Sequence, residues 1–382
     1  MWITSSLKAA KTPTNIALGN FDGVHLGHQR VMAQVVRSDA DNGTEKAAEA
    51  ALTPELIGTL HTGIESAGIE TAGIETAGIE TAGIETAGIE TAGIEAAAGS
   101  WPIDTDRQPT AEANAKATVP HKTVVTFSPH PQEYFSGISK PLLTPVEEKT
   151  WQLARLGIHQ LVMLPFNQTL AALTPEAFVQ QILINGLQAK HISVGSDFRF
   201  GAGRSGTADQ LSAIAATYGV PVTRVSLKHE QGDRISSSRI RAALQAGEPN
   251  TAARLLGRPY TLTGRVVKGK QLGRTIGFPT ANLQIPSNKY LPRTGVYSVW
   301  AYGIIAAPLR GIMNIGHRPT VNGQTLSIEV HLLDWAGDLY GQLLTVSLEG
   351  FVRAEQKFDS LKQLKQQIAE DCQQAIDTLT TR

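Results

Sequence analysis

Residues 15–30 of the chain read NIALGNFDGVHLGHQR, and this stretch decides the fold of the N-terminal half. The short apolar run at 15–19 predicts a buried strand. A glycine-rich turn follows, and Val31, Val35 and Val36 then recur close to helical spacing. The stretch therefore predicts a strand that passes through a turn directly into a helix.

The same alternation continues from residue 122 to residue 257. Strands are predicted at KTVVTF, HQLVMLPF, HISVGSDF and VPVTRVSL, with helical segments between them. In LTPVEEKTWQLARLG, Thr144 can cap a helix, Pro145 suits its first position and Glu147 completes a capping box. Strands that alternate with helices predict a Rossmann-like parallel sheet with helical crossovers.

The pattern changes after Gly257. YTLTGRVVKG, GVYSVWAYG, LSIEVHLLD and QLLTVSLEGFVR are strand-like, and helices no longer separate them. They predict a small antiparallel β-barrel, followed by a C-terminal helix that Asp359 or Ser360 can cap. We place the domains at 1–246 and 258–382.

Composition narrows the function. The chain has 382 residues, with Lys plus Arg equal to Asp plus Glu at 34 each, which argues against nucleic acid or a membrane surface as the main partner. The single cysteine, Cys372, cannot form an internal disulfide, and no apolar run is long enough to span a membrane. We expect a cytoplasmic protein with small-molecule partners. The oligomeric state stays open.

A low-complexity block occupies residues 38–118. Within it Gly-Ile-Glu recurs every five residues, from Gly63 to Gly93. A period of five matches neither a helix nor a strand, so a disordered insertion is the favoured expectation. A pentapeptide-repeat β-helix is the ordered alternative, although seven copies would make fewer than two coils.

Two glycine-rich strings imitate nucleotide-binding motifs. GAGRSG, at 201–206, matches the dinucleotide fingerprint and suggests a Rossmann-type oxidoreductase, but SDFRF separates it from the preceding strand. GRVVKGKQ, at 264–271, has Gln271 where a P-loop needs Ser or Thr, and no helix is expected after it. Its Gly/Lys loop can still meet phosphates, so Gly269 and Lys270 remain candidates.

Two strings in the first half suit phosphate chemistry. His25 and His28 lie three apart at a predicted helix start, and Gly27 lets a ligand approach the free N–H groups there. ISSSRIR, at 235–241, places Arg239 and Arg241 after three hydroxyl side chains, which suits a cationic loop that closes on leaving phosphates. Surface histidines and an ordinary helix cap with solvated arginines are the alternatives.

The second half holds the string GRTIGFPTANL at 273–283. Pro279 restricts the backbone, and Thr280 and Asn282 offer two oxygen ligands on one side of an extended segment, as Mg²⁺ prefers. Glu329 alternates with Val330 along a strand and can face a barrel pocket as a proton acceptor. A capped turn and a solvated carboxylate are the alternative interpretations.

With these strings in place, the chain resembles the bacterial bifunctional riboflavin kinase/FAD synthetases over residues 15–37 and 119–380. GNFDGVHLGH, TFSPHP, VGSDFRFG, ISSSRIR, LLGRPY, GRTIGFPTANL, NIGHRPT, EVHLLD and DLYG carry the resemblance. It implies an N-terminal nucleotidyltransferase that joins FMN to the AMP part of ATP, giving FAD. It also implies a C-terminal kinase that phosphorylates riboflavin to FMN with ATP and Mg²⁺.

The resemblance also assigns residues. It implies that Glu329 is the catalytic base and that His25, His28 and Arg239 are further catalytic residues. It implies that Thr280 and Asn282 are ligands of Mg²⁺. ATP and flavin contacts are expected from Gly19, Phe21, Gly27, Gly195, Asp197, Phe198, Ser237, Ser238, Arg241, Gly269, Lys270, Gly273 and Pro279. A flavin carrier that uses the same pockets without turnover remains a further alternative.

Overall fold

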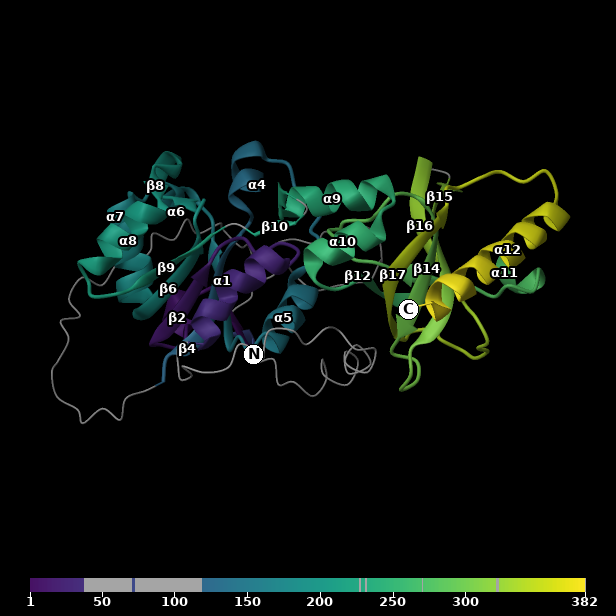
Figure 1. The fold of residues 1–382 in the computed structure, drawn as a ribbon, viewed down its shortest axis with the longest axis horizontal. Helices are drawn as coiled ribbons and strands as arrows, with labels where there is room; N and C mark the ends of the chain where they lie inside the picture. The colour runs from purple at the N-terminus through teal and green to yellow at the C-terminus, as the bar shows by residue number, and fades with distance from the viewer. Residues whose placement is uncertain are drawn as a thin grey trace, which may run out of the picture.

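The computed structural model describes residues 1–37, 71–72, 119–226, 228–230, 232–269, 271–320 and 323–381. The block at 38–118, with its expected disorder, lies outside the described residues apart from Thr71–Ala72, and so does the candidate Lys270. The described chain forms a parallel sheet, then a closed antiparallel barrel, then a terminal helix (Figure 1). The predicted fold class is confirmed.

The N-terminal half is built on a parallel sheet. Its strands are β1 (Trp2–Thr4), β2 (Thr14–Leu18), β3 (Thr71–Ala72), β4 (His121–Ser128), β5 (Gln160–Pro165), β6 (Ala189–Gly195) and β9 (Val222–Val225). They follow the order β3-β1-β5-β4-β2-β6-β9. β2 is central and buried throughout, and its last three residues, Ile16, Ala17 and Leu18, place apolar side chains on both faces, in line with the strand that the opening stretch predicts.

Helices of the N-terminal half cover both faces of this sheet, and the last two of them lie between the sheet and the barrel. They are η1 (Leu7–Ala9), α1 (Leu26–Val36), α4 (Pro131–Ser136), α5 (Val146–Arg155), α6 (Gln168–Ala171), α7 (Pro175–Ala177), the π-helix η3 (Phe178–Gly186), α8 (Ala208–Ala216), α9 (Ser237–Ala246) and α10 (Pro249–Leu256). Ala17 packs in one core with α1 and α5, whereas Ile16 and Leu18 pack in another with η3 and α8. Successive side chains of a strand point to opposite faces, which produces this division.

The predicted Thr144 cap of α5 is wrong. Pro145 is the N-cap residue, and it makes no side-chain cap hydrogen bond. The Thr144 hydroxyl instead accepts a hydrogen bond from the backbone N–H of Gly23 at 2.9 Å, and its own N–H donates to Asp22 Oδ1 at 3.2 Å. Thr144 therefore braces the glycine-rich turn after β2.

The C-terminal half is a closed barrel of six strands with the order β12-β13-β16-β15-β14-β17. Its elements are β12 (Tyr260–Val267), α11 (Leu272–Thr275), β13 (Ala281–Gln284), β14 (Gly295–Tyr302), β15 (Leu309–Thr320), β16 (Gly323–Leu332), β17 (Leu343–Arg353) and α12 (Leu361–Thr380). The expectation that no helix follows GRVVKGKQ was wrong, because the single turn α11 follows it. Ser360, not Asp359, caps α12.

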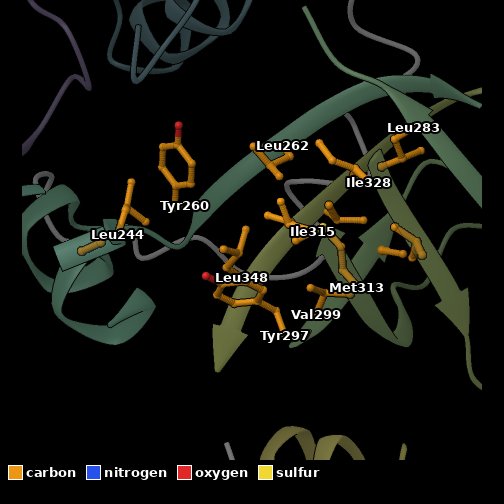
Figure 2. Close-up of a cluster of buried hydrophobic side chains, with 14 of the residues drawn as sticks. Leu244, Tyr260, Leu262, Leu283, Tyr297, Val299, Met313, Ile315, Ile328 and Leu348 are labelled. Atoms are coloured by element: carbon orange, nitrogen blue, oxygen red, sulfur yellow. The ribbon is translucent and has the colours of Figure 1, made fainter. Parts of the chain in front are cut away.

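The barrel core continues into the linker helices. Figure 2 shows Leu262, Ile315, Ile328 and Leu348 pointing into the barrel, with Leu244 of α9 on the side of Tyr260, and all belong to one buried cluster. In Figure 1, α9 and α10 lie between the parallel sheet and the barrel, and α12 lies along the barrel's outer side. Helices α9 and α10 thus share one apolar core with the barrel, whereas the strands of the parallel sheet pack in two further clusters.

Two candidate active sites

A cavity of about 920 Å³ opens at the carboxyl ends of the parallel strands. Ligands of open α/β sheets bind at this end. Gly19 follows β2, His130 follows β4, and Gly195 ends β6, and all three line the cavity. Besides Gly19 and Gly195, the predicted site residues that line it are Phe21, His25, Gly27, His28, Asp197, Phe198, Ser237, Ser238 and Arg241.

The two histidines lie together at the start of α1. His25 is the N-cap residue, and its Nδ1 accepts a hydrogen bond from the backbone N–H of His28 at 3.3 Å. Their rings stack with centroids 3.5 Å apart. A Cβ at Gly27 would lie 3.1 Å from the His25 ring, so a glycine keeps this approach open. The H-x-G-H spacing thus presents two imidazoles and a helix N-terminus to one cavity.

Both imidazoles are neutral at physiological pH. Burial lowers the pKa of His25 to about 4, although Asp22 opposes the shift. Burial also lowers the pKa of His28 well below its usual value, and the neighbouring His25 adds to the effect. Neutral imidazoles meet phosphate as hydrogen-bond donors, so positive charge must come from other side chains.

Arginines and lysines supply that charge. Six cationic side chains line the cavity against three carboxylates, although the whole chain has no net charge. The cations are Lys140, Arg199, Arg204, Lys228, Arg234 and Arg241, and the carboxylates are Asp22, Glu133 and Asp197. An excess of cations in a cleft attracts polyphosphate anions.

Two ion pairs hold cations at the cavity wall. Arg241 Nη2 lies 2.5 Å from Asp22 Oδ2, which joins α9 to the glycine-rich turn. Arg234 pairs with Asp197, and both side chains line the cavity. Sequence reasoning missed Asp22 and Arg234, although Asp22 stands inside the quoted string GNFDGVHLGH.

Arg239 does not line the cavity. Its Nη1 donates to the backbone oxygens of Glu230 and Asp233, at 2.9 and 3.1 Å. These residues belong to the hairpin of β10 (His229–Glu230) and β11 (Asp233–Arg234). Arg239 and Arg241 are two residues apart in α9, and side chains at this spacing point to nearly opposite sides of a helix. Arg241 therefore lines the cavity, whereas Arg239 braces the hairpin.

A second polar site lies on the outer face of the barrel. Glu329 of β16 stands opposite Asn282 of β13 and opposite Asn314 of β15. Its neighbours Ile328 and Val330 are buried in the barrel core. Glu329 and Val330 thus point in opposite directions, as expected, but the carboxylate faces outward rather than into the barrel.

The GRTIGFPTANL segment surrounds this carboxylate. Thr280 Oγ1 donates to Glu329 Oε2 at 3.3 Å, and the Pro279 carbonyl lies 2.7 Å from His331 Nδ1. A Cβ at Gly269 would overlap the Asn282 amide, and one at Gly273 would overlap the Phe278 carbonyl. The structure therefore brings Thr280, Asn282 and Glu329 together, with both glycines packed closely beside them.

The comparisons with known proteins follow this division. Residues 256–379 match the riboflavin kinase family, and residues 7–49 and 109–239 match the FAD synthetase family. The chain is 44% identical to the bifunctional riboflavin kinase/FMN adenylyltransferase of Escherichia coli K12, over 65% of this chain and 79% of the relative. It is 39% identical to the Bacillus subtilis protein of the same name, over 66% and 81%.

The chain belongs to the bifunctional riboflavin kinase/FMN adenylyltransferase family. The crystal structure of a macrolide-efflux protein from Streptococcus pneumoniae is similar over 97% of each chain, with 25% identity and a TM-score of 0.68. That likeness extends over both halves of the fold. No helix among the described residues is long and apolar enough to cross a membrane.

Membership of the riboflavin kinase/FMN adenylyltransferase family disfavours the dinucleotide interpretation, and the structure gives a physical reason. GAGRSG does not leave a strand of the parallel sheet. It connects β7 (Arg199–Phe200) and β8 (Gly206–Thr207), two strands of a hairpin, through the turn η4 (Ala202–Arg204). Gly201, Gly203 and Arg204 line the same cavity as the histidines.

Proposed function

We propose that residues 258–382 phosphorylate riboflavin to FMN and that residues 1–246 then adenylylate FMN to FAD, each step consuming one ATP. The observation that carries this proposal is the pairing of two distinct polar sites with the two family matches. A hydroxyl, amide and carboxylate cluster lies in the riboflavin kinase segment. A cationic cavity with two neutral histidines lies in the FAD synthetase segment.

The kinase step needs a proton acceptor. The ribityl hydroxyl attacks the γ-phosphorus of ATP, the bond to the β,γ-bridging oxygen breaks, and ADP leaves. A primary alcohol is a poor nucleophile, so its proton passes to Glu329 as the new bond forms. The half-buried carboxylate is held by Thr280 at 3.3 Å, which supports its role as this base.

Thr280 and Asn282 are proposed ligands of Mg²⁺ in the ATP complex. The Thr280 hydroxyl hydrogen points to Glu329, which leaves its oxygen lone pairs for a cation, and Asn282 supplies an amide oxygen. No cluster of three or more His, Cys, Asp or Glu side chains among the described residues could hold a metal. Phosphates and water would complete the shell, as is usual for Mg²⁺, which would neutralise phosphate charge. Thr280→Val should raise the Mg²⁺ concentration needed for half-maximal kinase rate, and Thr280→Ser should restore it.

The transferase step needs charge stabilisation rather than a base. The FMN phosphate is already an anion, and it attacks the α-phosphorus of ATP while the bond to the α,β-bridging oxygen breaks and pyrophosphate leaves. His25 and His28 would donate hydrogen bonds to the phosphates, and Arg241 would offset the charge of the leaving group. Ser237 and Ser238 line the same wall at the N-terminus of α9.

The partners proposed for the chain are riboflavin, FMN, FAD and ATP, with no nucleic acid, in a cytoplasmic setting. The direct test is to incubate the purified chain with riboflavin, ATP and Mg²⁺ and to separate the flavins by chromatography. FMN should appear first and FAD should follow. Flavin that stays as riboflavin while bound to the protein would instead identify a carrier.

A further inference from the structure

The segment 255–260, LLGRPY, joins α10 to β12 and reaches back to the histidine turn. Arg258 Nη2 donates to the Gly23 carbonyl at 2.9 Å, and Arg258 Nη1 donates to the Val24 carbonyl at 3.4 Å. Gln29 of α1 completes the link, because its Nε2 donates to the carbonyls of Val24 and Leu256, both at 3.0 Å. A segment of the kinase match therefore holds the turn that carries His25.

This turn has an unfavourable backbone. Phe21, Gly23 and Val24 have positive φ angles of 50°, 88° and 45°. A β-branched residue such as Val24 rarely adopts this conformation, and it persists only where surrounding contacts enforce it. Because Val24 directly precedes the N-cap residue His25, its conformation sets where the stacked imidazoles enter the cavity.

The Arg258 side chain is well placed to hold the Gly23–Val24 turn in this backbone conformation. The side chain is buried, and its planar guanidinium presents two nitrogens to two successive carbonyls. Burial lowers its pKa to about 10, while the nearby Glu148 opposes the shift, so the group stays charged at neutral pH. Glu148 in turn pairs with the buried Lys289 of the barrel half, Nζ to Oε2 at 2.5 Å. The hydrogen bonds of the fork therefore go to the Gly23–Val24 turn, and the Glu148 carboxylate adds a favourable charge nearby.

We propose that Arg258 is a positioning residue for adenylyl transfer: from the kinase half, it fixes the Gly23–Val24 turn and so places His25 and His28 for catalysis in the other half. This inference rests on the proposed function, in which the histidine cavity performs that reaction. It assigns LLGRPY, which neither reaction uses directly, a role between the two sites. It also makes the geometry of the transferase depend on the docked barrel.

The test uses the full chain and measures both reactions in the same preparation. Arg258→Met keeps the apolar stem and removes the donors, and Arg258→Lys keeps a charge without the fork. The matched control is Arg254→Met, on the exposed face of α10. Arg258→Met should lower kcat/KM for FMN adenylylation about 100-fold, a cost typical of misplaced catalytic groups. Riboflavin phosphorylation should stay within about threefold of the parent, and Arg258→Lys should fall between.

Two outcomes overturn the inference. One is an unchanged adenylylation rate in Arg258→Met. The other is an equal loss of both reactions together with a lowered melting temperature, which would make Arg258 a general structural residue. Should Arg258→Met not fold, Gln29→Met breaks the same link from α1 and should selectively lower adenylylation, whereas equal effects on both reactions would contradict the proposal. A parent chain that makes no FAD would refute the proposed function instead, so the two failures are distinguishable.

Discussion

The hydroxyl of Thr280 lies 3.3 Å from the carboxylate of Glu329, on the outer face of the barrel. This contact joins Thr280, the proposed ligand of Mg²⁺, to Glu329, the proposed proton acceptor of the kinase reaction. Glu329→Gln keeps the size and the hydrogen bond but cannot accept a proton, so it should lower riboflavin phosphorylation by about 10²–10⁴-fold. Conversion of FMN to FAD should remain close to that of the parent, because it uses the other site. Both rates are measured by flavin chromatography.

Asp334→Asn provides the control for this prediction. Asp334 follows β16, pairs with Arg310 on the surface and has a φ of 56°, a conformation that asparagine tolerates. It should keep both activities. Kinase turnover of Glu329→Gln within a few-fold of the parent would remove Glu329 from the role of base.

His28→Ala should show the opposite selectivity. The substitution removes a donor at the phosphate site and the ring that stacks on His25, so FMN adenylylation should fall by about 10²–10³-fold. Riboflavin phosphorylation should be unaffected. His159→Ala, at an exposed residue just before the N-terminal end of β5 and away from the carboxyl ends that form the cavity, should change neither rate. If His28→Ala and His159→Ala lowered FMN adenylylation equally, the loss would reflect general damage to the protein rather than a role of His28.

Acid should destabilise the N-terminal half through His25. The folded pKa is about 4 and the ordinary value is 6.5, so the unfolded chain binds more protons between these pH values. Stability is therefore complete above pH 6.5 and is lost as the pH falls through 4, by up to about 3 kcal/mol from this group. The melting temperature should drop between pH 7 and pH 4.5.

His25→Asn isolates this contribution. Asparagine is a good N-cap residue, so α1 keeps its cap while the titrating group is removed. The drop in melting temperature between pH 7 and pH 4.5 should be smaller in this variant than in the parent. An identical drop in both proteins would mean that His25 does not carry the acid sensitivity.

Removing residues 40–117 and bridging the gap with a short Gly/Ser linker should leave both reactions largely unchanged. The FAD synthetase match skips residues 50–108, and the block lies between α1 and β4, where its described part is only the two-residue strand β3 at the edge of the sheet. Shortening a loop from about eighty to about ten residues halves its length three times and removes roughly 2 kcal/mol of closure entropy cost, so the melting temperature should rise slightly or stay constant. A large rise in KM for FMN would instead assign the block a part in the transferase cavity.

The sequence was sufficient for the order of elements and for most of the transferase cavity. Short-range patterns made this possible: the strand at 15–19, the H-x-G-H spacing and the hydroxyl-rich start of α9 are all local. The start of α7 is also local: Thr174 precedes Pro175, and its hydroxyl caps the helix by accepting a hydrogen bond from the Ala177 N–H at 3.2 Å.

What the sequence left out depends on contacts between distant segments. Thr144 has the right neighbours for a cap, but the turn at Gly23 competes for its hydroxyl. Arg234 joins the cavity only because β10 and β11 fold back over it. The outward direction of Glu329 follows from which face of β16 the closed barrel buries, and alternation along one strand cannot settle that.

The fate of two labels in ATP tests the central claim most directly. The full chain is incubated with riboflavin, Mg²⁺ and ATP labelled at either the γ- or the α-phosphorus, and the flavins are separated and counted. The two-step account predicts that the γ-label enters FMN and remains in FAD, while the α-label enters FAD alone. The account would be contradicted by α-label in FMN, or by FAD that carries no α-label.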